Sequence, residues 1–324
     1  MAWFLLTLGT IILWGVTDIL YRASLDRNDP LSHHKNFIWI GIIMALAGCI
    51  MASWSDTLFD SIKSVVEEGL YLVPLCFIYA IAIFFGLLGK KHLPASIISP
   101  LENIGGALAG IILYYYFLLT GYIDPSYTIE VLDFIATGII IVAVIVLGCQ
   151  EQEMFKQELI SGEKDPKHRF GALVLFLPIL CTLIDVFSVA EVGGISGNSG
   201  LITAGAEEFI PAIDFFVFEC AGFAVASICM WLYLAIAKKH VYNPLQPEEM
   251  CRCGAAMGET FGTMTFIFAS SLNYVLTTPV TSLHCLLTIV LARVFLKERL
   301  TKKQYVCVAL LVTGIVLFGI SDIF

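Results

Sequence analysis

The most restrictive feature of the sequence is a succession of ten apolar segments, each long enough to cross a lipid bilayer as a helix. A spanning helix needs roughly 20 mostly apolar residues, and backbone in lipid must satisfy its hydrogen bonds within the segment. The composition agrees, because only 14% of the residues are charged, against about 25% in a soluble domain. We therefore predict an all-α membrane protein with ten transmembrane helices. The predicted segments are 3–22, 37–55, 70–89, 94–119, 130–149, 170–190, 211–237, 252–270, 276–296 and 303–322.

The basic residues predict how these segments are oriented. Sixteen of the 18 Lys and Arg residues lie in alternate connections, and only Lys63 lies in the other set of connections. The positive-inside rule places the basic connections in the cytoplasm and both termini outside it. The first segment lacks a basic n-region and a cleavage site, so it is predicted to be a retained span rather than a signal peptide. The expected location is the cell (cytoplasmic) membrane, as a multi-pass protein.

Several functional classes find no support in the sequence. The net charge of −9 comes with no basic patch for nucleic acid. No phosphate loop, HExxH or GxSxG motif is present, so no catalytic group, cofactor or metal site is predicted. Cys251 with Cys253, and His33 with His34, are weak metal signals. The other eight cysteines lie in apolar segments, where they are expected to pack as small hydrophobic residues.

The two halves of the chain align in the same order. Because each half has five spans, the second copy of such a repeat must be inverted relative to the first, which is typical of transporters. We expect one five-helix repeat over residues 1–149, a cytoplasmic connecting loop over 150–169 and a second repeat over 170–324. The alignment pairs 12–20 with 179–187, 108–113 with 291–296, Asp18 with Asp185 and Gly138 with Gly314.

Residues 278–319 resemble the closing signature of the drug/metabolite transporter (DMT) superfamily, EamA-like family. The shared marks are a Pro-containing ninth span, Glu-Arg-Leu-Thr at 298–301 and a Gly-containing tenth span, and Trp14-Gly15 is a further likeness. The first half departs from the pattern, because three tyrosines at 114–116 stand where the family has an acidic element. The resemblance implies secondary transport of small metabolites, often outward, and an EamA-like repeat in each half.

Charged residues within the spans are the candidates for function. Each costs roughly 2.5–3.5 kcal/mol to insert, so it should face the bundle interior or an aqueous cavity. Arg293 lies close to Lys297 and is expected to reach the cytoplasmic surface. The set is Asp18, Glu102, Asp185, Glu219, Glu259, His284 and Arg293, with Asn103 and Asn273 as neutral companions.

Two carboxylates, Asp18 and Asp185, occupy equivalent positions in the repeat alignment. With both termini outside, Asp18 lies toward the cytoplasmic end of its span and Asp185 toward the outer end of its own. An inverted repeat would place them at opposite mouths of one pathway. The alternative is that both are solvated carboxylates at helix ends.

The fourth and ninth spans carry Glu102, Asn103 and His284. The family resemblance implies that the first, third, fourth, sixth, eighth and ninth spans line a cavity. Glu102 and His284 are then candidates for proton or substrate binding, since a buried carboxyl or an imidazole can exchange protons near neutrality. The alternative is an interhelical hydrogen bond with no further role.

The eighth span supplies a third acidic candidate, Glu259, within the polar stretch 258–263. Trp14 lies one helical turn from Asp18, and Tyr79 lies in the third span. Aromatic rings beside carboxylates can bind an organic cation, although aromatic residues at helical spacing also serve as packing.

These observations predict a secondary transporter that moves a small cationic or zwitterionic metabolite by alternating access with proton coupling. The expected partners are that solute, protons and the lipid bilayer, and a homodimer is left open. Two alternatives remain, a membrane-embedded enzyme and a non-transporting scaffold. The predicted substrate- or proton-binding residues are Trp14, Asp18, Tyr79, Glu102, Asn103, Asp185, Glu259 and His284.

Overall fold

A computed structural model describes residues 2–26, 29–67, 72–93, 95–103, 176–191, 210–297 and 300–321, with a few isolated positions between 132 and 146. All regular secondary structure in these residues is helical. The predicted connecting loop at 150–169 and most of the predicted fourth and fifth spans lie outside them. The helices are α1 (Ala2–Ser24), α2 (Ser32–Trp54), α3 (Leu58–Glu67), α4 (Leu72–His92), α5 (Ala95–Glu102), α8 (Phe176–Glu191), α9 (Ala212–Ile236), α10 (Met250–Thr281), α11 (His284–Phe295) and α12 (Lys302–Ser321), with a 3-10 turn at Pro247–Glu249.

The membrane assignment is confirmed by the length and the hydropathy of the helices. Among the described residues, α1, α2 and α9 are each long and apolar enough to cross a bilayer. Large apolar side chains such as Leu5, Ile50 and Ile236 are exposed on them, as expected for a lipid-facing surface. The chain is therefore a multi-pass helical membrane protein, while the count of ten spans and the inverted repeat remain predictions.

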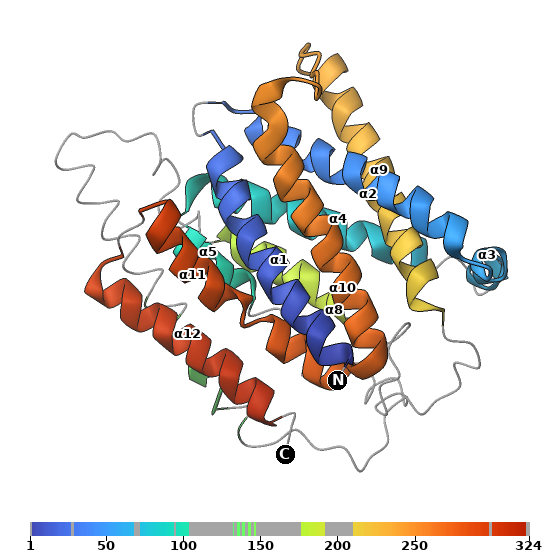
Figure 1. Ribbon diagram of the computed structural model, residues 1–324. Coiled ribbons are helices and arrows are strands. Elements are labelled where there is room, and N and C mark those ends of the chain that lie inside the picture. Colours follow the sequence, from blue (N-terminus) through green and yellow to red (C-terminus); the bar gives the residue numbers. More distant parts are fainter. Residues whose placement is uncertain are drawn as a thin grey trace.

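Two pairs of long helices form the frame of the bundle (Figure 1). One pair is α1 with α10, which pack against each other along most of α1, and the other pair is α2 with α9. The second pair approaches closely at Gly41 of α2, where a Cβ atom would lie 1.8 Å from Ser227 Oγ and 2.8 Å from the backbone oxygen of Phe223. Only a glycine permits this separation. Buried side chains of α1, α2, α4, α9 and α10 form the main apolar core between the pairs.

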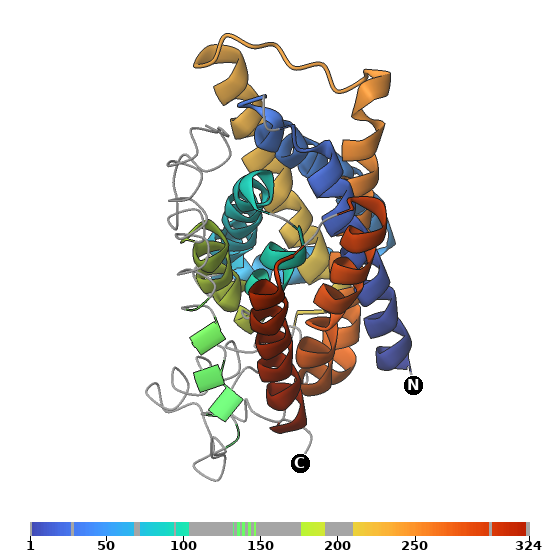
Figure 2. The ribbon, with the colours of Figure 1, turned by 90° about the vertical axis from the view of Figure 1, so that its left-hand side faces the viewer.

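Several basic residues lie at one end of the bundle. The connections from α1 to α2 and from α9 to α10 lie at one end, and the start of α1 and the end of α12 lie at the other (Figures 1 and 2). Arg22, Lys35, Lys91, Lys238 and Arg252 belong to these two connections or to the helix ends beside them. This common end is the one that the positive-inside rule predicts to be cytoplasmic.

The predicted boundary between the eighth and ninth spans is wrong. The sequence predicted segments at 252–270 and 276–296, whereas α10 continues to Thr281 and α11 begins at His284. The polar residues between the predicted segments suggested a connection, but a helix tolerates them. Ser271, for example, donates its hydroxyl to the backbone oxygen of Phe268 at 2.9 Å. The helix break therefore falls at Ser282 and Leu283.

A short amphipathic helix, α3, occupies part of the connection predicted at 56–69. It is tied to the start of α9 through Asp214, which is fully buried. Thr57 and Ser61 donate hydrogen bonds to Asp214 Oδ2 at 2.7 and 2.6 Å, and Ser55 donates to Oδ1. One buried carboxylate thus joins the end of α2, the start of α3 and α9.

Candidate functional site

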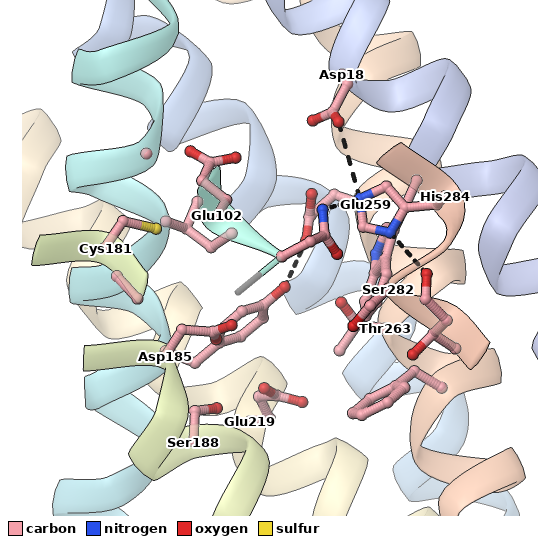
Figure 3. A pocket seen from close by; sticks show the side chains of 18 of the residues that line it. Asp18, Glu102, Cys181, Asp185, Ser188, Glu219, Glu259, Thr263, Ser282 and His284 are labelled. Carbon is pink, nitrogen blue, oxygen red and sulfur yellow. Dashed lines mark hydrogen bonds and ion pairs between the residues drawn. The ribbon is translucent and has the colours of Figure 1, made fainter. Parts of the chain in front are cut away.

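A single cavity brings together all eight residues that the sequence predicted for the site. It lies between α1, α4, α5, α8, α9, α10 and α11, and Figure 3 shows side chains from these helices converging on it. The centres of water molecules can reach about 110 Å³ of it, where one water needs roughly 10–15 Å³. Several waters or a small organic solute therefore fit. Its polar lining includes Asp18, Lys90, Glu102, Asn103, Asp185, Ser188, Glu219, Glu259, Thr263, Ser282 and His284.

Asp18 lies inside the bundle. It is 6% exposed and accepts hydrogen bonds at Oδ2 from Ser99 at 2.6 Å and from Thr288 at 3.0 Å. Asp185 of α8 lines the same cavity. The placement of the two carboxylates at opposite mouths of one pathway remains a prediction.

Lys90 is the site residue that sequence reasoning missed. It was counted among the basic residues of a connection, but α4 continues past it to His92 and its side chain is buried. Lys90 Nζ lies 3.2 Å from Asp18 Oδ1 and also forms an ion pair with Glu102. Lys90 directly follows a predicted apolar segment, and this position could have identified it as a site residue. Two carboxylates buried in a helix bundle require a nearby cation.

Glu102 is the last residue of α5 and lies against Gly86 of α4. A Cβ atom on Gly86 would lie 2.7 Å from Glu102 Oε1, so the glycine leaves room for the carboxyl group. Glu102 Oε2 pairs with Lys90, while Oε1 has no hydrogen-bond partner among the described residues. One oxygen of this carboxyl group is thus available to a ligand.

His284 is the first residue of α11 and lies at the cavity, where it contacts Asn103 at the end of α5. Its Nδ1 lies 2.9 Å from the backbone oxygen of Thr281, which can only accept, so Nδ1 carries the hydrogen. The amide of Asn103 donates to His284 Nε2 at 3.1 Å and to the backbone oxygen of Ser99 at 2.7 Å. These contacts describe a neutral imidazole. Its Nε2 also lies 3.8 Å from Asp18 Oδ2, where a proton on that nitrogen would create an ion pair.

The two aromatic candidates, Trp14 and Tyr79, both line the cavity. Tyr79 donates its hydroxyl to Glu259 Oε1 at 2.7 Å. The Trp14 ring packs against Phe266, with centroids 5.3 Å apart, and against the edge of His284 at 5.5 Å. The side chains of Trp14 and Tyr79 thus combine packing with access to the cavity.

Two carboxylates, Asp185 of α8 and Glu219 of α9, lie in a second part of the cavity. In Figure 3 they lie with Ser188 below Glu102 and Asp18. Glu219 is 4% exposed, and its Oε2 has no hydrogen-bond partner in the described part of the chain. The sequence analysis marked Glu219 as an intramembrane charge but did not assign it to the site.

The charge of the cavity is strongly unbalanced. Five carboxyl groups line it, and among the described lining residues Lys90 is the one permanent cation. Burial of an unpaired carboxylate is unfavourable, so such groups bind a cation or a proton. Within the described residues, no three metal-ligating side chains are arranged to hold a metal ion.

The fold and the cavity define a multi-pass helical membrane protein with a polar, acidic chamber inside its bundle. Residues 195–320 match the EamA-like transporter family, so the resemblance to this family and to its DMT superfamily is confirmed there. Comparison with curated proteins gave no match. A solved structure described as "Crystal structure of protein" is 14% identical, with 98% of this chain and 96% of that chain covered and a TM-score of 0.56. At this identity the likeness shows the fold alone.

Proposed function

We propose that the protein is a secondary transporter that carries a small cationic or zwitterionic metabolite across the cytoplasmic membrane through this cavity. The observation that carries the proposal is the convergence of five carboxyl groups from five helices on one chamber inside a membrane bundle. A scaffold has no need of buried acids that are expensive to insert into lipid. The family match over residues 195–320 supports transport rather than enzymatic chemistry.

Alternating access is supported by a helix break that lies at the cavity. The helices α10 and α11 are separated at Ser282 and Leu283. The Asn103–His284 hydrogen bond connects this break to the end of α5 at Glu102. Discontinuous helices at the binding site are a recurrent device of transporters, because half-helices can move relative to each other.

Proton coupling follows from the chemistry of the same acids. A carboxyl group that releases its cation inside a bundle is more stable when it takes up a proton. Exchange of a cationic solute for protons therefore avoids an uncompensated charge in the membrane. This exchange predicts that a pH gradient drives solute flux.

The test is flux in proteoliposomes with an imposed pH gradient. Candidate organic cations and amino acids are added outside, and a pH-sensitive dye trapped inside reports proton exit. Asp18→Asn, Glu102→Gln and Glu259→Gln should each reduce solute-dependent proton flux at least tenfold. Glu67→Gln is the matched control, because the Glu67 side chain is 67% exposed on α3. Flux that is unchanged in all three folded variants, or no flux with any solute, contradicts the proposal.

A further inference from the structure

We infer that the cavity has two electrostatically different halves, and that Asp185, Glu219 and Glu259 form a subsite for the ammonium group of an organic amine without a carboxylate. The inference rests on the proposed transport function and narrows its substrate class. It assigns a binding role to Glu219 and a different role to Asp18 and Glu102. The two halves are defined by which carboxylates have a cation from the protein itself.

The first half contains a cation of its own, although Glu102 Oε1 has no hydrogen-bond partner among the described residues. Lys90 pairs with both Asp18 and Glu102, and Asp18 also accepts hydrogen bonds from Ser99 and Thr288. A solute ammonium group would have to displace the Lys90 ammonium, which is buried and cannot leave the cavity easily. This half is therefore a poor site for a second cation.

The second half has acids without a cation. No ion pair in the described part of the chain involves Asp185, Glu219 or Glu259, and Glu259 accepts the neutral hydroxyl of Tyr79 at 2.7 Å. Glu219 is more than nine-tenths buried and lines the cavity with an oxygen that has no partner there. A buried carboxylate oxygen of this kind requires a donor from a ligand. An ammonium group supplies three donors and the missing charge.

The rest of the lining indicates the remainder of the solute. The rings of Trp14, Tyr79 and Phe266 provide an apolar and aromatic surface. They suit a hydrocarbon or aromatic body attached to the amine. Among the described lining residues, the one permanent cation for a solute carboxylate is Lys90, which already pairs with two carboxylates. An amino acid is therefore expected to bind less well than the corresponding amine.

The experiment compares three probes of similar size with the purified full-length protein in nanodiscs. The probes are 2-phenylethylamine, phenylalanine and 3-phenylpropionate, which are a cation, a zwitterion and an anion. Binding is measured by isothermal calorimetry, and folding of each variant is checked by thermal unfolding. We expect 2-phenylethylamine to bind at least tenfold more tightly than phenylalanine, with no binding of 3-phenylpropionate.

The variants locate the ammonium group. Glu219→Gln and Asp185→Asn should each weaken 2-phenylethylamine binding about tenfold, because each removes a hydrogen bond between charged groups. Glu67→Gln, on the exposed surface of α3, is the control and should leave binding unchanged. Equal binding of all three probes, tighter binding of phenylalanine, or binding unaffected by both Glu219→Gln and Asp185→Asn overturns the inference.

Failure of the inference and failure of the transport proposal give different results. If 2-phenylethylamine binds as expected but no pH gradient moves it in proteoliposomes, the subsite stands and the transport function fails. If flux occurs for phenylalanine and depends on Asp18 and Glu102 but not on Glu219, transport stands and the subsite is overturned. Binding and flux that are both lost in Glu219→Gln support the two together.

Discussion

At the residue scale, Lys90 determines the electrostatics of the first half of the cavity, which contains Asp18 and Glu102. It is the shared partner of Asp18 and Glu102, and all three side chains are at least 85% buried. Removing one partner of such a group leaves the others charged and without compensation. The three residues therefore behave as a unit, although they come from α4, α1 and the end of α5.

Lys90→Met should destabilise the protein by about 3 kcal/mol, because it leaves two buried carboxylates without a cation. Thermal unfolding in detergent micelles measures the change. The double variant Lys90→Met, Glu102→Gln should regain part of the lost stability, because it removes one of the two unpaired charges. A single variant as stable as the wild type would show that Lys90 is not the partner of these acids.

Asp29, in the connection between α1 and α2, provides a pH-dependent contribution to stability. Partial burial opposes ionisation of its carboxyl group. Donation from Lys35 at 2.7 Å and from the Leu31 backbone N–H at 2.8 Å outweighs that burial, so the pKa of Asp29 is lowered from 3.8. A group with a lowered pKa stabilises the folded protein above its unfolded-state pKa and loses that effect as the pH falls.

Asp29→Asn should lower the Tm by about 2 °C at pH 7, because a partly exposed pair contributes at most about 1 kcal/mol. The difference from the wild type should begin to shrink as the pH falls below about 4, where the carboxyl group becomes protonated in the unfolded chain, and should vanish only below the lowered pKa of Asp29 in the folded protein. Scanning fluorimetry from about pH 2 to pH 8 checks this. A difference that persists at low pH would assign the effect to shape rather than to charge.

At the element scale, close packing of paired helices holds the cavity walls in place. The contact between α2 and α9 depends on Gly41, and α10 approaches α1 in the same way at Gly258, where a Cβ atom would lie 2.1 Å from Thr17 Oγ1. The hydrophobic effect does not hold helices together in lipid. Small residues at such contacts let the two backbones approach closely, so that van der Waals packing stabilises the pair.

Gly41→Ala should destabilise the bundle by about 1–3 kcal/mol, because the added methyl group meets the side chain of Ser227 and the backbone of α9. Gly254→Ala is the matched control, since its Cβ would lie at an ordinary 3.6 Å from Leu20 Cδ1. Thermal unfolding of both variants should separate them by several degrees. Equal stability would mean that α2 and α9 are less closely packed than described.

The sequence predicted helices far better than it predicted their ends and contacts. Apolar length located α1, α2 and α9 within a few residues, because lipid forces such segments to be helical. The cost of burying charge identified five of the eight predicted lining residues, and the uncharged Trp14, Tyr79 and Asn103 were predicted as their aromatic and amide companions. The pairing of Lys90 with Asp18 and Glu102 depends on how three distant helices pack, and no local pattern encodes it. The position of the helix break after Thr281 was not predicted either, because the residues before it are compatible with both a helix and a loop.

At the scale of the whole molecule, two basic connections and the chain termini lie at opposite ends of the bundle. The connections from α1 to α2 and from α9 to α10 lie at one end, and the start of α1 and the end of α12 lie at the other (Figure 2). This arrangement is what a cytoplasmic basic face and two outer termini require. The orientation in the membrane remains a prediction of the positive-inside rule.

Reporter fusions in a bacterial host measure that orientation. Alkaline phosphatase, which is active only outside the cytoplasm, should be active when fused after Phe324 and inactive when fused after Leu245, in the exposed connection between α9 and α10. Fluorescent protein fusions should give the reverse pattern. Activity after Leu245 together with inactivity after Phe324 would invert the proposed topology.

The length of the unbroken helix α10 leads us to expect that membrane thickness affects the cavity. Its 32 residues extend about 48 Å at 1.5 Å per residue, well beyond the roughly 30 Å of hydrocarbon in a bilayer. A helix of this length that crosses a bilayer must tilt or project, and the angle depends on the lipid around it. Because α10 carries Glu259 in its first third and ends at the break before His284, we expect the acyl chain length of the surrounding lipid to influence the shape of the chamber.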